Sequence, residues 1–404
     1  MTQQRGGPLQ GIRVIELTKV WAGPYAGKLL SFLGAEVIRI ESEGSLDVTR
    51  IYGVDDLNKA PGFMAVNPQK LSAQINMKSE QGIALLLDLL AKSDILIENL
   101  RPGAIERLGL GYERVKNVNP GIIFTSMGMY GAAGPLAYQT GYAPCFAALS
   151  GLSSVVGYEG EAPGGMNVRY ADSTFGTAAA LASVAALRHR NRTGEGQFID
   201  VSAVETMTSM MGDAIMKSTL NDEIQACDGN RHAEMAPHGV YPCQNNEWLA
   251  LAAKDDDAWA VIANTIAASV GKPELATDPR FATLAARKQH EAELDSLISH
   301  WSTCQDASEA AAKLQHAGVA ASKSFTSLDL ISDQHLWARS FYPEVSTSDG
   351  NSRAIVGPGW KMSRAAQIHA GAPRLGEHNH YVFGEILGLS EGEQAKLAEA
   401  GVTR

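Results

Sequence analysis

Short apolar runs alternate with segments of helical period through residues 12–126, and this alternation constrains the fold more than any other feature of the sequence. Each run is rich in β-branched residues, as buried strands are, and a loop separates it from the segment that follows. This order predicts an α/β fold in which right-handed crossovers join the strands of a parallel sheet. The expected strands are 12–17, 37–40, 71–75, 94–97 and 122–126, and the expected helices are 25–33, 80–92 and 102–118.

The rest of the chain changes character twice. Small-residue helices are expected at 143–152 and 176–187, then a short strand at 198–201 and a long helix at about 203–220. Two β-type runs around Asn245-Asn246 predict a hairpin that opens a smaller α+β domain. The helices expected there are 256–269, 287–302 and 306–317. The last stretch, with a helix expected at 381–387, again resembles residues 12–126 in its pattern of apolar runs, turns and helices.

Composition limits the partners that the chain can bind. The net charge is −10, so no global basic field exists to hold nucleic acid or an anionic membrane, and an anionic ligand would need a local basic site. No apolar run approaches the length of a membrane span, and the N-terminal residues lack the apolar h-region of a signal peptide. The protein is therefore expected in the cytoplasm. The scattered cysteines are expected to be free intracellular thiols, and no metal site is expected; they are Cys145, Cys227, Cys243 and Cys304.

The loop after the first expected strand, TKVWAGPYAG, is the first place to look for a ligand, because open α/β sheets bind ligands at the carboxyl ends of their strands. It lacks the GxGxxG pattern, which argues against a nicotinamide enzyme even though Glu41 stands where a ribose-binding acid would. The chain also lacks a GxxxxGK[ST] phosphate loop and a GxSxG nucleophile elbow.

Basic residues recur near the ends of the expected strands in this half of the chain. They are Lys19, Arg39, Lys78, Arg101 and Arg107. Most lysines and arginines simply solvate a protein surface, and that interpretation stays open for each of them. Together with helix N-termini, however, they form a set that can hold phosphate groups inside an acidic protein.

Asp172, in the segment NVRYADSTFG, is the carboxylate with the clearest functional interpretation. It precedes the helix expected at 176–187, and an aspartate at that position is most often an N-cap. The functional alternative is that the positive end of the helix holds the carboxylate ionised beside the glycine-rich stretch APGGMNV. An ionised carboxylate there can attack a carbonyl group as a nucleophile.

Seven segments resemble the class III coenzyme A transferases, the CaiB/BaiF family that includes formyl-CoA transferase, carnitine CoA-transferase and α-methylacyl-CoA racemase. They are GIRVIELTKVWAGPYAGKLLSFLGAEVIRIE, DILIENLRPGAIERLGLGYERVKNVNPGIIFTSMGMYG, YADSTFG, LRHRNRTGEGQFIDVS, HGVYPC, DPRFAT and APRLGEHN, in the order of the family. The resemblance implies a Rossmann-like large domain, a smaller α+β domain and an interlocked homodimer. The implied domains are 1–205 with 341–404 (large), 206–224 (linker helix) and 225–340 (small).

The resemblance also implies an enzyme with coenzyme A as a substrate and with no permanently bound cofactor or metal. Asp172 falls on the family's catalytic aspartate, which attacks the donor thioester and forms an anhydride and then an aspartyl-CoA thioester. An acceptor organic acid then takes the coenzyme A, and succinyl-CoA is a plausible donor. The implied coenzyme A contacts are Trp21, Ala22, Arg39, Ile75, Lys78, Asn99, Leu100, Arg101, Arg107, Thr140 and Tyr142.

The sequence departs from formyl-CoA transferase at four places. Trp21 replaces its gating Gln, Ser42 a basic residue and Ala143 an acidic one, and CQNNEW replaces a glycine-rich loop. These changes argue against formyl or oxalate specificity and favour a larger or less polar acyl group. Two alternatives remain: a 2-methylacyl-CoA racemase, disfavoured because Tyr142 replaces the catalytic His, and a non-catalytic subunit of a hetero-oligomer, disfavoured by Asp172. Tyrosine is a poor base near neutrality because its pKa is about 10.

Overall fold

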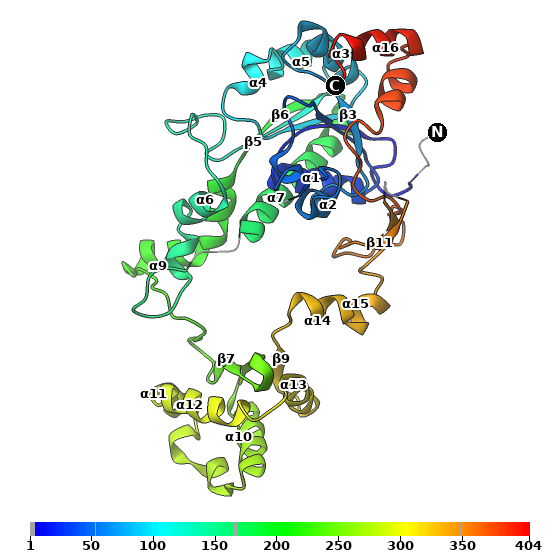
Figure 1. The fold of residues 1–404 in the computed structure, drawn as a ribbon. Helices are drawn as coiled ribbons and strands as arrows, with labels where there is room; N and C mark the ends of the chain where they lie inside the picture. The colour runs from blue at the N-terminus through cyan, green and yellow to red at the C-terminus, as the bar shows by residue number, and fades with distance from the viewer. Residues whose placement is uncertain (1–4, 53, 165–167, 348–349) are drawn as a thin grey trace. The chain divides into compact units, whose positions relative to one another are not determined.

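The computed structural model describes residues 5–52, 54–164, 168–347 and 350–404 of the chain (Figure 1). These residues form two compact units. Unit 1 consists of Met1–Ser153, Gly165–Ile224 and His335–Arg404, and unit 2 of Ser154–Gly164 and Gln225–Gln334. In the part of the chain that is described, no helix is both long and apolar enough to span a membrane.

Unit 1 contains a six-stranded sheet in the order β3-β2-β1-β4-β5-β6. All neighbouring strands are parallel, so the α/β fold with a parallel sheet is confirmed. This strand order reverses between β1 and β4, as in doubly wound folds. The strands are β1 (Arg13–Leu17), β2 (Glu36–Glu41), β3 (Leu71–Gln74), β4 (Ile95–Glu98), β5 (Ile123–Gly128) and β6 (Gln197–Ser202).

Helices cover both faces of this sheet, which is why its central strands are almost continuously apolar. Helices α3 and α5 lie on one side together with α16, and α1 and α7 lie on the other (Figure 1). The helices of unit 1 are α1 (Ala22–Phe32), α2 (Pro61–Val66), α3 (Glu80–Leu90), α4 (Ala104–Arg107), α5 (Tyr112–Val118), α6 (Ala143–Leu149), α7 (Val168–Thr193), α8 (Ala203–Thr208), α9 (Gly212–Asn221) and α16 (Glu391–Glu399). The 3₁₀ helices η1 (Val48–Arg50) and η3 (Ser209–Met211), the π-helix η7 (Tyr381–Ile386) and a hairpin of β10 (Glu344–Ser346) and β11 (Ser352–Ala354) complete it.

Helix α7 packs directly on α1, and Gly176 permits their close approach. A Cβ atom on Gly176 would lie 2.4 Å from the carbonyl oxygen of Ala22, a distance at which the helices would have to separate. Phe175 and Ala179 on the same helix enter the apolar core beneath the sheet. This packing places the first turns of α7 beside the loop that follows β1.

The C-terminal segment closes the edge of the sheet at β3. The Ser72 N–H donates to Nδ1 of His378 (3.2 Å), and the Gln74 N–H donates to Oδ1 of Asn379 (2.8 Å). The His378 N–H in turn donates to the Ser72 carbonyl (2.9 Å). The segment APRLGEHN therefore satisfies the backbone groups that an edge strand would otherwise leave open.

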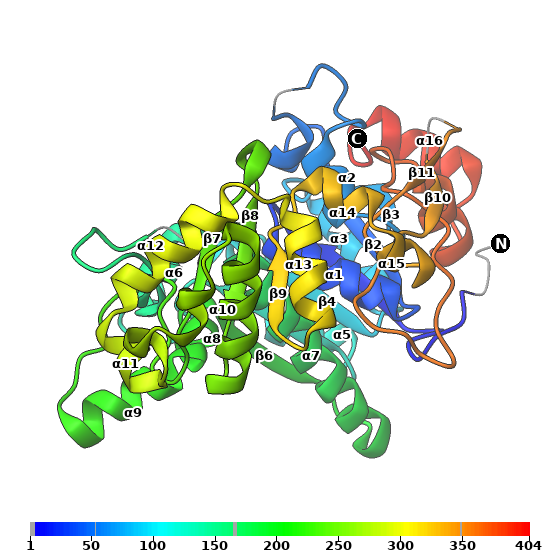
Figure 2. The ribbon, with the colours of Figure 1, turned by 90° about the horizontal axis from the view of Figure 1, so that it is seen from below.

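Unit 2 contains a three-stranded antiparallel sheet in the order β7-β8-β9. Asn245 and Asn246 adopt left-handed conformations (φ +58° and +59°) between β7 and β8, so the expected hairpin is confirmed. Helices α10, α12 and α13 pack on one face of the sheet (Figure 2). The elements are β7 (His238–Pro242), η4 (Gln244–Asn246), β8 (Trp248–Ala252), α10 (Asp256–Val270), η5 (Pro273–Thr277), η6 (Pro279–Phe281), α11 (Leu284–Gln289), α12 (Glu291–Ser302), α13 (Ala307–His316), β9 (Ala320–Lys323) and α14 (Ser327–Ser332). Two short elements, η2 (Leu152–Val155) and α15 (Gln334–Ala338), cross from one unit into the other along the chain.

Several expected helices have different bounds in the structure. The segment 102–118 forms two helices, because Gly109 is left-handed (φ +71°) and ends the first of them. The segment 203–220 divides into α8, η3 and α9, and the segment 287–302 into α11 and α12. Helix α7 begins at Val168, eight residues earlier than expected, and ends at Thr193. The four cysteines are free thiols, as expected.

Candidate active site

The loops after β1 and β4 flank the point where the strand order reverses, and a cavity of about 780 Å³ opens there. A doubly wound sheet binds its ligands at this point because the crossovers run to opposite faces and leave a crevice. The cavity brings together ten of the twelve residues named from the sequence. They are Trp21, Ala22, Lys78, Asn99, Leu100, Arg101, Arg107, Thr140, Tyr142 and Asp172.

The loop after β1 is held in a strained conformation. Val20 has φ +71°, which is unfavourable for a β-branched residue. Its N–H donates to both carboxylate oxygens of Asp47 at 3.2 Å. The Asn99 side chain accepts from the Lys19 N–H (2.7 Å) and donates to the Lys19 carbonyl (2.9 Å). These contacts from β4 and from the segment after β2 set the position at which Trp21 enters the cavity wall.

Arg39, named from the sequence as a coenzyme A contact, lies outside the cavity, so its side chain cannot reach a ligand there. The side chain is fully buried and pairs with Glu16 (2.6 Å), Glu41 (3.2 Å) and Asp47. Its guanidinium also donates to the Thr18 carbonyl (2.9 Å), at the start of the strained loop. Burial alone would raise the pKa of Glu41, but the two neighbouring guanidinium groups of Arg39 and Arg50 lower it to about 2. Arg39 therefore supports the loop from within the protein.

Ile75 also differs from its expected position. Its side chain is fully buried in the apolar core on the α3 side of the sheet. Its N–H donates to the Glu41 carbonyl at 2.8 Å. The Ile75 side chain and N–H are therefore occupied by the fold and are directed away from the cavity.

The wall formed by the loops after β3 and β4 is basic. Lys78, Arg101 and Arg107 are exposed there. Lys19, which also lines the cavity, donates to Oγ of Ser45 (2.6 Å) and to two carbonyls, and burial lowers its pKa. Together with the half-buried Lys19 from the loop after β1, these three exposed cations form a local basic site within a chain of net charge −10.

Asp172 lies at the other wall, as the fifth residue of α7. The helix has already begun at Val168, so of the two interpretations of Asp172 the structure excludes the N-cap. The carboxyl group is partly buried next to Ala171 and Phe175, and in the described part of the chain nothing donates a hydrogen bond to it. Burial raises its pKa to about 6, opposite to the direction expected from the helix end. Residues 165–167 of the glycine-rich stretch lie outside the described residues.

Side chains that the sequence did not single out complete the surroundings of Asp172. The indole N–H of Trp21 donates to Oγ of Ser173 at 3.2 Å. The Arg169 guanidinium lies over the Trp21 ring, with 5.8 Å between its carbon and the ring centroid. Arg169 and Asp172 are three residues apart, and residues at this spacing share a face of a helix. This spacing points to Arg169 only once the helix is known to begin at Val168. Cys145, one turn into α6, also lines the cavity.

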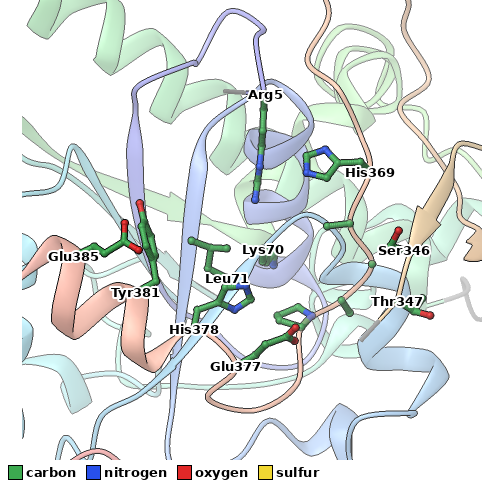
Figure 3. Close-up of a pocket in the computed structure, with 14 residues that line it drawn as sticks. Arg5, Lys70, Leu71, Ser346, Thr347, His369, Glu377, His378, Tyr381 and Glu385 are labelled. Atoms are coloured by element: carbon green, nitrogen blue, oxygen red, sulfur yellow. The ribbon is translucent and has the colours of Figure 1, made fainter. Parts of the chain in front are cut away.

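A second cavity of about 470 Å³ lies where the N-terminal residues meet the C-terminal segment (Figure 3). Arg5, His369 and His378 line it, but so do Glu377 and Glu385. Lys70, also in its wall, is already paired with Glu16 at 2.7 Å. The cavity adjoins the beginning of β3, whereas ligands of such sheets bind at the carboxyl ends of the strands. The cavity beside Asp172 is therefore the candidate active site.

No group of three His, Cys, Asp or Glu side chains is arranged to share a metal ion, as far as residues 5–52, 54–164, 168–347 and 350–404 are concerned. The charged groups that line the cavity beside Asp172 are instead one partly buried carboxylate and several cations. Such an arrangement suits a covalent reaction at the carboxylate with an anionic ligand held by the opposite wall.

Comparison with known proteins agrees with this arrangement. The sequence profile of CoA-transferase family III matches residues 9–379. The chain is 33% identical over 398 residues to the succinyl-CoA–D-citramalate CoA-transferase of Chloroflexus aurantiacus, with 98% of each chain covered. It is 29% identical to the succinyl-CoA:glutarate CoA-transferase of Mus musculus, covering 98% of this chain and 90% of the mouse protein. A crystal structure of a CAIB/BAIF family protein from Brucella suis is similar with a TM-score of 0.87 at 29% identity, covering 94% of this chain and 100% of that one.

Proposed function

The chain belongs to CoA-transferase family III, and we propose that it moves coenzyme A from succinyl-CoA to a dicarboxylic acid through covalent intermediates on Asp172. Two of its relatives are named for succinyl-CoA as one substrate and for citramalate or glutarate as the other. Both of these acids carry two carboxyl groups. The names therefore support a dicarboxylic acceptor, and the Asp172 cavity supplies the chemistry for the transfer.

The observation that carries the proposal is the partly buried carboxylate of Asp172 facing a cavity with a basic wall. With a pKa of about 6, the carboxylate is ionised at neutral pH but only weakly stabilised by its surroundings. A desolvated, weakly hydrogen-bonded anion is a better nucleophile than a carboxylate fully solvated by water. The opposite wall supplies cations for the phosphates of coenzyme A, through Lys78, Arg101 and Arg107.

The first half of the reaction loads the enzyme. A carboxylate oxygen of Asp172 attacks the thioester carbonyl of succinyl-CoA, the carbon–sulfur bond breaks, and the coenzyme A thiolate leaves a mixed anhydride. The thiolate then attacks the Asp172 carbonyl carbon and releases succinate, which forms an aspartyl-CoA thioester. Backbone N–H groups near each reacting carbonyl would stabilise the oxyanion that develops.

The second half repeats these steps with the acceptor. A carboxylate of the acceptor attacks the aspartyl thioester, the thiolate leaves again, and a second anhydride forms. The thiolate attacks the acceptor carbonyl, which yields the new acyl-CoA and restores the Asp172 carboxylate. No proton or electron is gained or lost overall, and coenzyme A is a substrate in this scheme.

The cavity also suggests how coenzyme A is held. Trp21 and Ala22 from the first loop, with Asn99 and Leu100 from the loop after β4, would line the pantetheine channel. Thr140 and Tyr142, at the start of α6, would flank the thioester. The Asn99 side chain is already bound to the Lys19 backbone, so its contact with the ligand would be made by its own backbone.

A panel of acids with succinyl-CoA as donor tests the proposal. We expect the wild-type enzyme to form new acyl-CoA with at least one dicarboxylic acid, and Asp172→Asn to lose more than 10³-fold in kcat, as is roughly the loss for a nucleophile. Asp213→Asn, at an exposed aspartate in the first turn of α9, is the matched control and should keep full activity. Retained activity in Asp172→Asn would contradict the proposal. Rapid uptake of α-deuterium into a 2-methylacyl-CoA without an acceptor acid would favour a racemase instead.

A further inference from the structure

The loop that follows β4 forms much of the cavity wall along which coenzyme A is proposed to lie. Leu100, Arg101 and Arg107 of this loop line the cavity beside Asp172. The loop contains one helix, α4, which is four residues long and whose N-cap residue makes no side-chain hydrogen bond to it. Regular secondary structure therefore does little to fix the shape of this wall.

Glu98, the last residue of β4, immediately precedes this loop. It is 4% exposed, and in the parallel sheet it is paired with Leu17 of β1 and Ser126 of β5. Side chains alternate along a strand, so Glu98 shares a face with Leu96, which packs in the apolar core on the α3 side of the sheet. Glu98 is not among the residues that line the cavity, and so it can act on a ligand there only through its neighbours.

Both carboxylate oxygens of Glu98 accept hydrogen bonds. Oε2 accepts from the Leu100 N–H at 2.9 Å, two residues after the strand ends. Oε1 accepts from the hydroxyl of Ser126 on the neighbouring strand. The carboxylate therefore ties the beginning of the loop to the end of the sheet.

Glu98 forms no ion pair within residues 5–52, 54–164, 168–347 and 350–404. Burial raises its pKa, the hydrogen bonds from Ser126 and Leu100 act in the opposite direction, and the negative charge of Glu106 raises it further. A buried carboxylate without a cation lowers the stability of a fold, and an apolar side chain would suit this layer better. Buried ionisable groups of this kind cluster at functional sites, and Glu98 lies at the ligand-binding end of the sheet.

We propose that Glu98 is a positioning residue, which binds the Leu100 N–H and so holds the loop after β4 in the shape that receives the pantetheine arm of coenzyme A. The inference rests on the proposed function, because it assumes that coenzyme A lies along this wall. Glu98 acts on coenzyme A through the positions of Leu100 and Arg101. Asp172 is carried by α7, which packs on the opposite face of the sheet, so a change at Glu98 should leave the nucleophile in place.

Two substitutions separate the hydrogen bond from the charge. Glu98→Met keeps the length of the side chain but leaves the Leu100 N–H without its acceptor. Glu98→Gln removes the charge but not the contacts, because its amide oxygen accepts from Leu100 and its NH₂ group donates to the Ser126 hydroxyl, which can turn and accept. We expect kcat/KM for succinyl-CoA to fall roughly 10- to 100-fold in Glu98→Met and less than about threefold in Glu98→Gln.

The two substrates of the proposed reaction distinguish positioning from a general defect. The value of kcat/KM for the donor includes the binding of a free coenzyme A thioester, whereas the value for the acceptor is measured on an enzyme that already carries coenzyme A on Asp172. Glu98→Met should therefore change kcat/KM for the most active dicarboxylic acid of the panel by less than about threefold.

Two matched controls lie on β5. Ser126→Ala removes the other hydrogen bond of Glu98 and leaves the Leu100 contact, so kcat/KM for the donor should change less than about threefold. Thr125→Val removes a buried hydrogen bond with Ser183 (2.8 Å) on the opposite face of the strand. It should lower the free energy of unfolding without changing the ratio of donor to acceptor kcat/KM.

Hydrogen exchange of the wild-type enzyme tests the contact without a variant. The Leu100 amide should exchange at least roughly tenfold more slowly than an unprotected amide, as mass spectrometry at single-residue resolution can measure. Exchange at the unprotected rate would overturn the proposal even if Glu98→Met failed to fold.

The kinetic outcomes separate this inference from the function on which it rests. A wild-type enzyme that transfers coenzyme A to no acid overturns both. If the wild type is active, unchanged donor kcat/KM in Glu98→Met overturns the role of Glu98 alone, and so does an equal loss for donor and acceptor. A loss in Glu98→Gln as large as that in Glu98→Met also overturns it, because the charge rather than the hydrogen bond would then be needed.

Discussion

Asp172 combines two properties that usually exclude one another, a position in the first turns of a long helix and a carboxyl group without a hydrogen-bond donor among the described residues. The helix end favours the ionised form, but burial beside Ala171 and Phe175 disfavours it and has the larger effect. The result is a carboxylate that is ionised near neutrality and reactive. A surface aspartate would be ionised at lower pH but would be a weaker nucleophile.

The raised pKa of Asp172 predicts the pH dependence of the reaction. The carboxylate attacks only when ionised, so kcat/KM for the donor should rise tenfold per pH unit below about 6 and level off above it. Donor kinetics between pH 4.5 and 8 measure this directly. Activity that stays constant down to pH 4.5 would show that Asp172 titrates as an ordinary aspartate or is not the nucleophile.

Arg39 illustrates what the sequence could not reveal at the residue scale. It follows an apolar strand residue and resembles other basic residues near strand ends, so a role in phosphate binding was a reasonable prediction. Its partners Glu16 and Asp47 come from other parts of the chain, and only the fold brings the three together. Long-range pairing of this kind leaves no local pattern in a single sequence.

The buried ion pairs predict a large effect on stability. Arg39→Met would leave Glu16, Glu41 and Asp47 with an uncompensated charge, and we expect it to lower the free energy of unfolding by about 3–5 kcal/mol. Lys59→Met, which removes an exposed ion pair with Asp56, should lower the free energy of unfolding far less. Urea unfolding of both variants measures the difference. An equal loss in the free energy of unfolding for the two variants would contradict a stabilising role for the buried ion pairs of Arg39.

At the scale of single elements, the strands followed from the sequence and several helix ends did not. Every strand of the parallel sheet lies within two residues of its expected bounds. For the central strands the reason is that two covered faces demand a continuous apolar run. The start of α7 was missed because Asp172 resembles an N-cap, although the backbone is already helical from Val168. The position of a helix end depends on contacts with the rest of the fold more than on the conformational preference of the local sequence.

The cover of the edge strand β3 predicts a second pH effect. Nδ1 of His378 accepts a hydrogen bond from the Ser72 N–H only when the ring is unprotonated at that nitrogen, and burial lowers the pKa of His378 below its usual value. The unfolded chain then binds the proton more readily than the folded one, so this contribution to stability is present at neutral pH. It is lost as the pH falls through the histidine range.

We expect His378→Asn, which offers a carbonyl oxygen that does not titrate, to reduce the decrease in Tm between pH 7.5 and 5.5. His300→Asn, at an exposed histidine of α12, is the control and should leave that decrease unchanged. Thermal unfolding of the wild type and both variants at pH 7.5 and 5.5 measures this decrease in Tm. The same pH response in His378→Asn and the wild type would contradict the role of the ring.

At the scale of the whole molecule, the α/β class followed from the sequence, whereas assembly did not. The cavity opens beside the loops in which the sequence predicted a ligand site, and the role of its residues stays a prediction. The interlocked homodimer and the division into a discontinuous large domain, a linker helix and a small domain stay predictions. The dimer predicts a particle of twice the chain mass of 43.0 kDa in light scattering, active without any second protein. A monomer, or activity only with a homologous partner, would contradict it.

The central claim is that coenzyme A passes through the Asp172 carboxylate, and an isotope measurement tests it most directly. When the acceptor carboxylate attacks the aspartyl thioester, one of its oxygens remains on Asp172 after the second anhydride breaks. Turnover of succinyl-CoA with ¹⁸O-labelled succinate should therefore place ¹⁸O in the peptide that contains Asp172, as read by mass spectrometry. Rapid exchange of label between succinate and succinyl-CoA, with no ¹⁸O in that peptide, would contradict the account, because it would mean that the transfer bypasses Asp172.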